Sequence, residues 1–237
     1  MMKYDILRVL IFVILCTGLL TCSTLYSQNI KISRDSLVNI IEFDGAFYNK
    51  YTLKQLIVDT CKASSVLRNK NQNYSENNLI DNNDHTAWVE GALNAGIGEK
   101  IRITFKDKNA LPYAIRVVPG YLKSEEIWYK NNRVANITIR TVGKEGDSEY
   151  IIDEWKDVSF RRDSLSKVSI SPVYIDISQN YIQHMGYNDF VAIEFEIMEV
   201  DNVGAIYNDT CISEMSFYEI NELIKSYSPE EYQKIKN

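Results

Sequence analysis

The stretch that decides the fold is "DFVAIEFEIMEV", which runs from Asp189 to Val200. Its apolar residues Val191, Ile193, Phe195 and Ile197 stand at every second position, and acidic residues separate the last three of them. Side chains of a β-strand point alternately to opposite faces, so a period of two indicates a strand with one buried and one wet face. This segment is therefore predicted to be a half-buried strand, with those four side chains turned inward.

The same alternation returns in several other segments: "KIRITF" (100–105), "AIRVV" (114–118), "NITIRTV" (136–142) and "VYIDIS" (173–178). No long helical pattern interrupts them, which argues against a doubly wound α/β fold. Many half-buried strands joined by loops are typical of two packed antiparallel sheets. The sequence thus predicts an all-β fold, an antiparallel β-sandwich of the jelly-roll type.

The overall charge limits the classes of partner. The 237 residues carry a formal net charge of −6, the sequence pI is near 5.1, and no basic run occurs. A nucleic-acid-binding protein needs clustered lysine and arginine to neutralise phosphates. We therefore expect no nucleic-acid partner.

The N-terminus has the pattern of an export signal. Lys3 and Arg8 precede an apolar run from 9 to 20, which is short for a spanning helix and suits the core of a secretory signal. Residues 1–27 are predicted to be this signal, with an uncleaved membrane anchor as an alternative. "LLTC" also resembles a loose lipobox, so a lipoprotein signal ending before Cys22 is the other alternative. The protein is expected to be exported: secreted, periplasmic, or anchored to the envelope by a lipid on Cys22, its one expected membrane contact.

The remaining chain divides into three parts. Residues 28–60 are predicted to form an N-terminal arm, residues 61–220 the jelly-roll domain, and residues 221–237 a short C-terminal helix or tail. Ser228, followed by Glu231 three residues later, is a helix-capping signature. Two cysteines, Cys61 and Cys211, lie beyond the signal. In an exported protein this number predicts one disulfide, and two buried free thiols are the alternative.

"NLIDNNDHTAWVEG" (78–91) is polar and has no apolar periodicity. It lacks the glycine and the final glutamate of an EF-hand loop, and no paired cysteines accompany His85 to make a zinc site. No serine-nucleophile elbow occurs in the chain either, and no carboxylate pair stands out from its many acids. The sequence therefore predicts no catalytic residues and no enzyme activity.

Five separated segments resemble one family. They are "ASSVL" (63–67), the 78–91 stretch, "GIGEKIRITF" (96–105), "GYLKSEEIWYKNNRVANITI" (120–139) and "CISEMSFYEI" (211–220). Together they resemble the NAD glycohydrolase translocation domain family. This family is a branch of the discoidin-like, coagulation factor V/VIII type C, galactose-binding-like fold. We expect no glycohydrolase domain in a chain of this length, and therefore no NAD hydrolysis.

The resemblance implies a galactose-binding-like jelly roll with its first and last strands adjacent, here with short N-terminal and C-terminal extensions. That adjacency brings Cys61 near Cys211. Related domains wrap a structural calcium with a "DG(x)nTxW" loop and a glutamate from the last strand. Asp81 and Thr86 match this loop, Glu214 matches the glutamate, and Asn78, Asn83 and Ser213 could add carbonyl ligands. The predicted metal set is therefore Asp81, Asn83, Thr86 and Glu214. The alternative is that Asp81 and Thr86 only cap the turn by bonding backbone amides, and that Glu214 pairs with a nearby donor.

Sugar recognition needs a flat apolar surface and a few fixed polar groups. The stretches around Trp88 and Tyr121 supply such residues, and the predicted ligand set is Trp88, Glu90, Tyr121, Lys123, Asn132 and Arg133. Two alternatives are structural: Trp88 as a core aromatic, and Arg133 as an ion-pair partner of Glu90 or Glu99. The predicted function is an exported, non-catalytic module that recognises a glycan or another envelope or host-surface ligand. A protein–protein module of an envelope or translocation complex is the alternative. A structural calcium is the only cofactor expected.

Overall fold

The computed structural model describes residues 39–43, 48–93, 95–161, 167–177 and 189–236. The predicted signal and Cys22 lie outside this part of the chain. The described elements are the strands β1 (Asn39–Phe43), β2 (Tyr48–Gln55), β3 (Val58–Ala63), β4 (Trp88–Val89), β5 (Lys100–Phe105), β6 (Ala114–Pro119), β7 (Asn132–Glu145), β8 (Ser148–Ser159), β9 (Val173–Asp176), β10 (Phe190–Asp201) and β11 (Thr210–Tyr227), and the helices η1 (Glu76–Leu79), α2 (Glu125–Lys130) and α4 (Pro229–Lys236).

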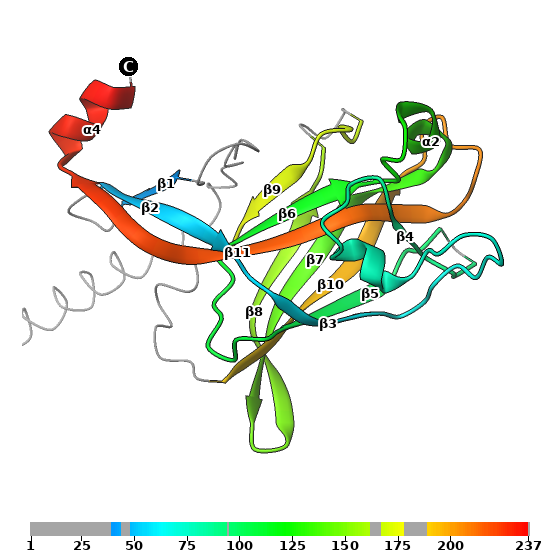
Figure 1. The fold of residues 1–237 in the computed structure, drawn as a ribbon, viewed down its shortest axis with the longest axis horizontal. Coiled ribbons are helices and arrows are strands. Elements are labelled where there is room, and N and C mark those ends of the chain that lie inside the picture. The colour runs from blue at the N-terminus through cyan, green and yellow to red at the C-terminus, as the bar shows by residue number, and fades with distance from the viewer. Residues whose placement is uncertain (1–38, 44–47, 94, 162–166, 178–188, 237) are drawn as a thin grey trace, which may run out of the picture.

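The strands form two packed layers (Figure 1). One layer has β11 at its centre, paired with β2, β4 and β6, while β1 and β9 extend it on either side. The other has β10 between β7 and β5, with β8 and β3 at its edges. A short parallel contact between β11 and β7 joins the layers, and all other strand pairs are antiparallel. The predicted β-sandwich jelly roll is confirmed.

Alternating residues of both layers build one core. β5 turns Ile101, Ile103 and Phe105 inward, and β11 contributes Met215 and Phe217 from the facing layer. Phe105 and Phe217 meet edge to face at 5.3 Å between ring centroids. Full burial of an aliphatic or aromatic side chain stabilises a fold by about 1.5–3 kcal/mol, so this shared interior holds the two layers together.

The defining strand follows its prediction with one exception. Ile193, Phe195 and Ile197 are buried, but Val191 is only half-buried. The register between β10 and β7 shifts between Phe190 and Ala192, and a bulge of this kind interrupts the alternation of faces. Phe190 and Ala192 are therefore the buried residues at this end of the strand.

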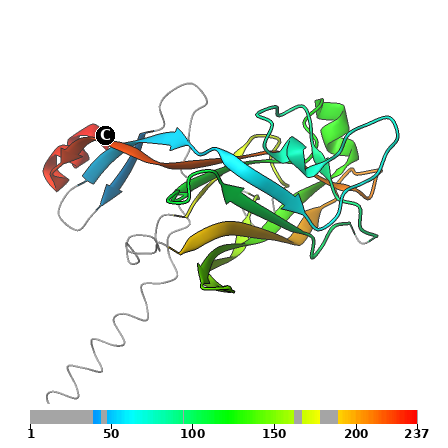
Figure 2. The same cartoon turned by 60° about the horizontal axis from the view of Figure 1, so that its bottom comes forward.

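The extensions take part in the sheet. β2 pairs with β11 and β3 pairs with β5, so the sheet begins upstream of the predicted boundary at Cys61. β11 continues to Tyr227, which makes residues 221–227 strand rather than tail. The three strands β1, β2 and β11 leave the body as a ribbon with α4 at its end (Figure 2). Helix α4 begins with the predicted capping box: Ser228 N donates to Glu231 Oε2 at 2.9 Å, and Glu231 N donates to Ser228 Oγ at 3.2 Å.

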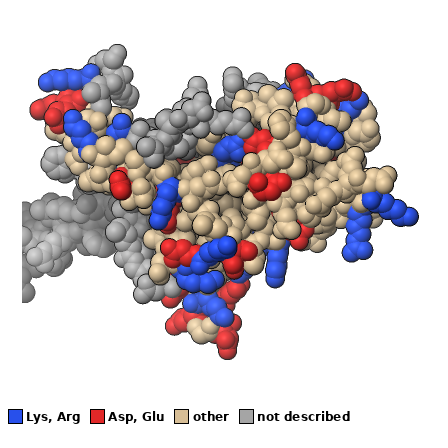
Figure 3. Space-filling view, viewed as in Figure 1, with Lys and Arg blue, Asp and Glu red and all other residues tan. Residues whose placement is uncertain are grey.

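The outer face of the β7–β10 layer is solvated and charged. Arg140 bonds to Glu154 and Glu196 at 2.6 and 2.7 Å, and Arg102 bonds to Glu149 at 2.7 Å. Figure 3 shows acidic and basic side chains mixed around the β7–β8 hairpin. Exposed ion pairs contribute little to stability, typically below about 1 kcal/mol each. Mixed charge gives this face no single sign with which to attract a polyion.

Candidate functional site

The polar stretch after η1 folds into a loop that is held by its own side chains. Asp81 accepts hydrogen bonds from Asn83 N at 2.9 Å and from Thr86 Oγ1 at 2.8 Å, and Thr86 Oγ1 also approaches Asn83 O at 2.9 Å. Asn82 between them has φ of +60°, a left-handed conformation that asparagine tolerates better than most residues. The loop thus faces Asp81, Asn83 and Thr86 toward one another, and Asp81 caps the turn, as the alternative to a metal site predicts.

A buried ion pair fixes this loop to the sheet. Asp84 in the loop accepts a hydrogen bond from Arg116 on β6 at 2.6 Å, and each side chain is about 8% exposed. Breaking such a pair by removing one partner leaves an uncompensated buried charge and costs about 3–5 kcal/mol. The loop is therefore a fixed part of the body.

Glu214 reaches the same loop from β11. It is 1% exposed, and Asn83 N donates to its Oε2 at a long distance of 3.3 Å. The other hydrogen-bond partner in the described part of the chain is Ser216 Oγ, at 3.4 Å. Burial, and then the charge of Asp81, raise the pKa of Glu214 to about 8. A weakly bonded buried carboxylate beside a second carboxylate is an unfavourable arrangement unless a proton or a cation joins them.

The four predicted metal ligands therefore converge on one place. Two carboxylates, a hydroxyl and an amide residue form an oxygen-rich donor set of the kind that calcium prefers. No group of three or more His, Cys, Asp or Glu side chains placed to hold a metal occurs within the described residues. Any cation here would depend on neutral oxygens as well as on Asp81 and Glu214. This donor set matches the ligand preference of a hard divalent cation.

Trp88 and Glu90 do not form the predicted ligand surface. Trp88 has no exposed area, and its Nε1 donates to Ser65 O at 2.9 Å, so its structural alternative is confirmed. Glu90 is 1% exposed and accepts from Ala92 N at 2.5 Å and Thr210 N at 3.3 Å. Burial raises the pKa of Glu90, and the hydrogen bonds from Ala92 N and Thr210 N partly offset this rise. Assigning both to a sugar site is wrong because neither side chain reaches the surface.

Asn132 and Arg133 are also buried, each 1% exposed. Asn132 Nδ2 donates to Asn208 O at 3.1 Å. The Arg133 guanidinium lies 4.7 Å from the Trp128 ring centroid and pairs with Asp201 at 3.2 Å. It also donates to several backbone carbonyls, those of Trp128, Tyr129, Asn131 and Val203. Arg133 is therefore an ion-pair partner inside the protein, as its structural alternative predicts, but the partner is Asp201 and not Glu90 or Glu99.

Asp201 shows how tightly this arginine is held. Burial alone would raise the pKa of Asp201, but hydrogen bonds from Val203 N and Val168 N and the charge of Arg133 lower it below its usual value. Because the pair is buried and hydrogen-bonded on both sides, it closes this end of the sandwich and is not available to a ligand.

The predicted disulfide is wrong as well. Cys61 and Cys211 are both free and buried. Cys61 lies opposite Ile103 in one layer, whereas Cys211 lies opposite Val89 in the other. Burial raises the pKa of the Cys61 thiol to about 12, and that of Cys211 is raised well above its usual value by the same cause. The alternative of two buried thiols is the one that the structure supports.

Tyr121 and Lys123 are the two predicted ligand residues that reach the surface, Tyr121 half-buried and Lys123 exposed. Tyr121 meets Tyr74 edge to face, with 6.1 Å between ring centroids. The pKa of Tyr74 is raised by burial first, then by Tyr121, with smaller contributions from Asp209 and Tyr207. The three tyrosines and Asp209 therefore lie close together. We name the surface formed by Tyr74, Tyr121, Tyr207 and Asp209 the loop face, and add to it Lys123, which lies two residues after Tyr121 in the chain.

Three members of the loop face were not predicted. Tyr74 precedes η1, and Tyr207 and Asp209 lie in the turn between β10 and β11. Ile206 N and Tyr207 N both donate to Lys130 O, at 2.9 and 3.0 Å, which fixes this turn against the end of α2. Their sequence signal was weak: 16 tyrosines occur in the chain, and nothing in the local pattern separates these two.

Comparison with known families gives one match. The model of the NAD glycohydrolase translocation F5/8 type C domain family matches residues 48–218, most of the chain. The chain belongs to this family. The matched range runs from the start of β2 to near the middle of β11, and so contains both the Asp81–Glu214 site and the loop face. No curated protein matches the chain.

Three solved structures illustrate how distant its structural neighbours are. The family 32 CBM from C. perfringens NanJ, in complex with galactose, is 11% identical with a TM-score of 0.42, over 70% of this chain and 99% of its own. CpGH89CBM32-5 from Clostridium perfringens, in complex with GalNAc-beta-1,3-galactose, is 13% identical with a TM-score of 0.44, over 68% and 94%. An F5/8 type C domain from Bacteroides fragilis is 13% identical with a TM-score of 0.45, over 70% and 98%.

Proposed function

We propose that this NAD glycohydrolase translocation F5/8 type C domain protein is an exported, non-catalytic binding module, and that its ligand is a glycan bound at the loop face. The observation that carries the proposal is the grouping of three tyrosines and one carboxylate from three separate loops. Tyr207 is 51% exposed, and Tyr74 and Tyr121 are half-buried. Their ring faces suit the apolar C–H surface of a sugar.

Asp209 supplies the fixed polar group that orients such a ligand. Its backbone carbonyl accepts a hydrogen bond from Asn132 N at 3.1 Å, which anchors the residue to β7. No hydrogen bond to its carboxylate occurs within the described part of the chain, so both oxygens can accept from sugar hydroxyls. Burial raises the pKa of Asp209. Lys123, exposed and two residues after Tyr121 in the same loop, would supply a donor to such a ligand.

A glycan array probed with the purified protein tests this function. Specific binding is expected, and it should be lost in Tyr207→Ala. Tyr150→Ala is the matched control, because Tyr150 is also a partly exposed tyrosine but lies on β8, away from the loop face. A blank array from folded protein would refute the glycan assignment and favour the alternative, a protein–protein module of an envelope or translocation complex.

We also propose that Asp81, Asn83, Thr86 and Glu214 hold a structural calcium ion. It would neutralise the two neighbouring carboxylates and stiffen the loop without taking part in ligand chemistry. Addition of calcium to chelator-treated protein should raise the melting temperature, and Asp81→Asn should abolish the rise. An unchanged melting temperature in the unmodified protein would leave the loop as a self-capped turn.

Export through residues 1–27 completes the proposal. The mass of the mature protein distinguishes its two forms. Cleavage before Gln28 gives an unmodified chain, whereas a lipid on Cys22 adds acyl mass and keeps the protein on the membrane. A mature mass that includes residues 1–21 would refute export by either signal. Within the described residues, no helix is sufficiently long and apolar to span a membrane.

A further inference from the structure

The long strand β11 has a gap in its pairing on one side. β4 pairs with Cys211 and Ile212, and β2 pairs from Tyr218 onward. Between these partners, residues 214–217 pair with β6 on the opposite side of β11, and among the described strands no ladder covers them on the side of the gap. The gap arises because the chain bends between β2 and β3, and β3 crosses to pair with β5 in the other layer.

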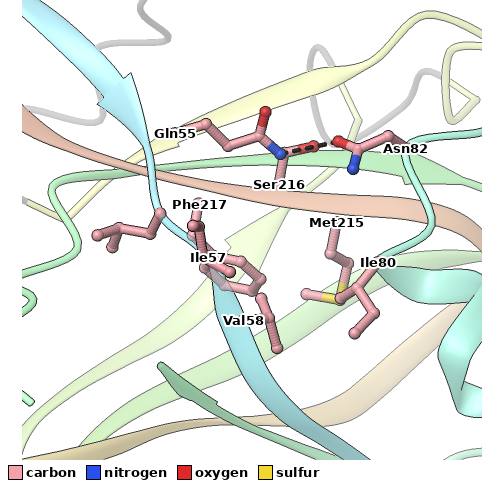
Figure 4. A pocket seen from close by; sticks show the side chains of 9 residues that line it. Gln55, Ile57, Val58, Ile80, Asn82, Met215, Ser216 and Phe217 are labelled. Carbon is pink, nitrogen blue, oxygen red and sulfur yellow. Dashed lines mark hydrogen bonds between the residues drawn. The ribbon is translucent and has the colours of Figure 1, made fainter. Parts of the chain in front are cut away.

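A pocket of about 370 Å³ occupies this gap, between the β2–β3 corner and the loop after η1 (Figure 4). Its two sides differ in chemistry. Gln55, Asn82 and Ser216 give it a polar side, where Gln55 Nε2 donates to Asn82 Oδ1 at 2.8 Å. Apolar side chains give it the other: Val58, Ile80, Met215 and Phe217. Pockets of this size that combine an apolar wall with a few polar groups are typical ligand sites.

We propose that an extended peptide segment of a partner protein enters this gap, pairs with β11 and places one aliphatic side chain in the apolar part of the pocket. An unpaired strand edge is a template for another backbone. The end of the gap already shows such a contact, since Leu56 N donates to Phe217 O at 2.8 Å. A peptide strand also turns successive side chains to opposite sides, which matches the polar and apolar sides of the pocket.

The charge near the gap specifies the neighbouring peptide residue. Asp81 adjoins Asn82 and is exposed. The nearby Arg116 guanidinium is bonded to Asp84. A peptide in which a lysine or arginine follows the aliphatic residue would place a positive charge beside Asp81. This preference should be largest in a chelated sample, because a cation bound at Asp81 would offset its charge.

The probe is the blocked peptide acetyl-Ser-Leu-Lys-Ser-amide, followed by NMR of the purified protein with labelled isoleucine and methionine methyl groups. Saturable shifts are expected at Ile80 and Met215. The same peptide with N-methyl-leucine keeps the side chains and loses one backbone donor, and should bind about threefold to tenfold more weakly. The peptide with glutamate in place of lysine should also bind more weakly than the original peptide. The absence of a saturable shift, or equal binding of the N-methyl peptide, would overturn the proposal.

A matched pair of variants locates the site. Ile80→Phe fills the pocket and should abolish binding, whereas Ile206→Phe places the same ring on an exposed turn and should leave it unchanged. The comparison of peptides on the unmodified protein needs no variant, so it holds even if Ile80→Phe unfolds. The proposal is independent of the glycan assignment: Tyr207→Ala should keep peptide binding, and Ile80→Phe should keep glycan binding.

Discussion

Replacement of Glu214 by glutamine should make the protein more stable at alkaline pH when divalent cations are removed. Glu214 is almost completely buried beside Asp81, and its two hydrogen bonds in the described part of the chain are long. Glutamine keeps the shape and an oxygen that can accept from Asn83 N. It removes the buried negative charge that has no bonded cation.

The direction in which stability changes with pH follows from the pKa of Glu214, which is raised from 4.5 to about 8 by burial and by Asp81. Between these values the folded protein holds a proton that the unfolded chain has released. Stability therefore falls as pH rises through this range, by at most about 1.4 kcal/mol per pH unit for this group, and is then level above the folded pKa. The total is several kcal/mol, an amount comparable with half of a typical domain's stability.

The assay is denaturant unfolding of both proteins at a series of pH values with a chelator present. Other groups titrate equally in the two proteins, so the difference between their unfolding free energies isolates Glu214. This difference should be small near pH 5 and should grow to about 2–4 kcal/mol in favour of Glu214→Gln near pH 8. Calcium should then stabilise the unmodified protein more than the variant. Parallel curves, or a variant less stable at pH 8, would refute the assignment of a strained buried carboxylate.

Three further outcomes follow from the buried groups. Arg133→Met leaves Asp201 buried without its cation and should lower the free energy of unfolding by about 3–5 kcal/mol, measurable by denaturant unfolding. Gly120→Ala should also destabilise the protein. Gly120 has φ of +83°, and an added Cβ would lie 2.6 Å from Arg133 Cγ and from Trp128 Nε1. A melting temperature equal to that of the parent would contradict this. Cys61 and Cys211 should resist a thiol reagent in the folded protein without its leader and react fully after denaturation, whereas a disulfide would leave both unreactive until reduction.

The sandwich could be predicted because its strands are half-buried, and half-burial is visible as alternation. Ile193, Phe195 and Ile197 follow the period of two without interruption. What alternation cannot show is where a register shifts, and Val191 was misplaced for that reason. The length of β11 was missed on similar grounds. Beyond Ile220 its side chains are exposed on both faces, so the strand there carries no contrast between a buried and a wet side.

The predicted metal ligands converge because a single loop and one strand supply them. Asp81, Asn83 and Thr86 lie within six residues, and turn chemistry alone brings them together. Glu214 lies on β11, far along the chain, and only the family resemblance connected it with the loop. The loop face had no comparable signal, because Tyr74, Tyr121 and Tyr207 come from three loops whose neighbourhood depends on the complete strand order.

The misassigned ligand residues have a common physical cause. The end of the sandwich is closed by loops and by the short helix α2, which lack the regular ladders that satisfy backbone groups inside a sheet. Glu90 accepts from the backbone of Ala92 and Thr210, and Arg133 donates to four backbone carbonyls. Buried polar groups must be paired, and loops of this kind obtain their partners from side chains. A dense group of polar and aromatic residues in such a stretch is therefore evidence first for loop closure. It becomes evidence for a binding site only where the side chains also reach the surface, as Tyr121 and Lys123 do.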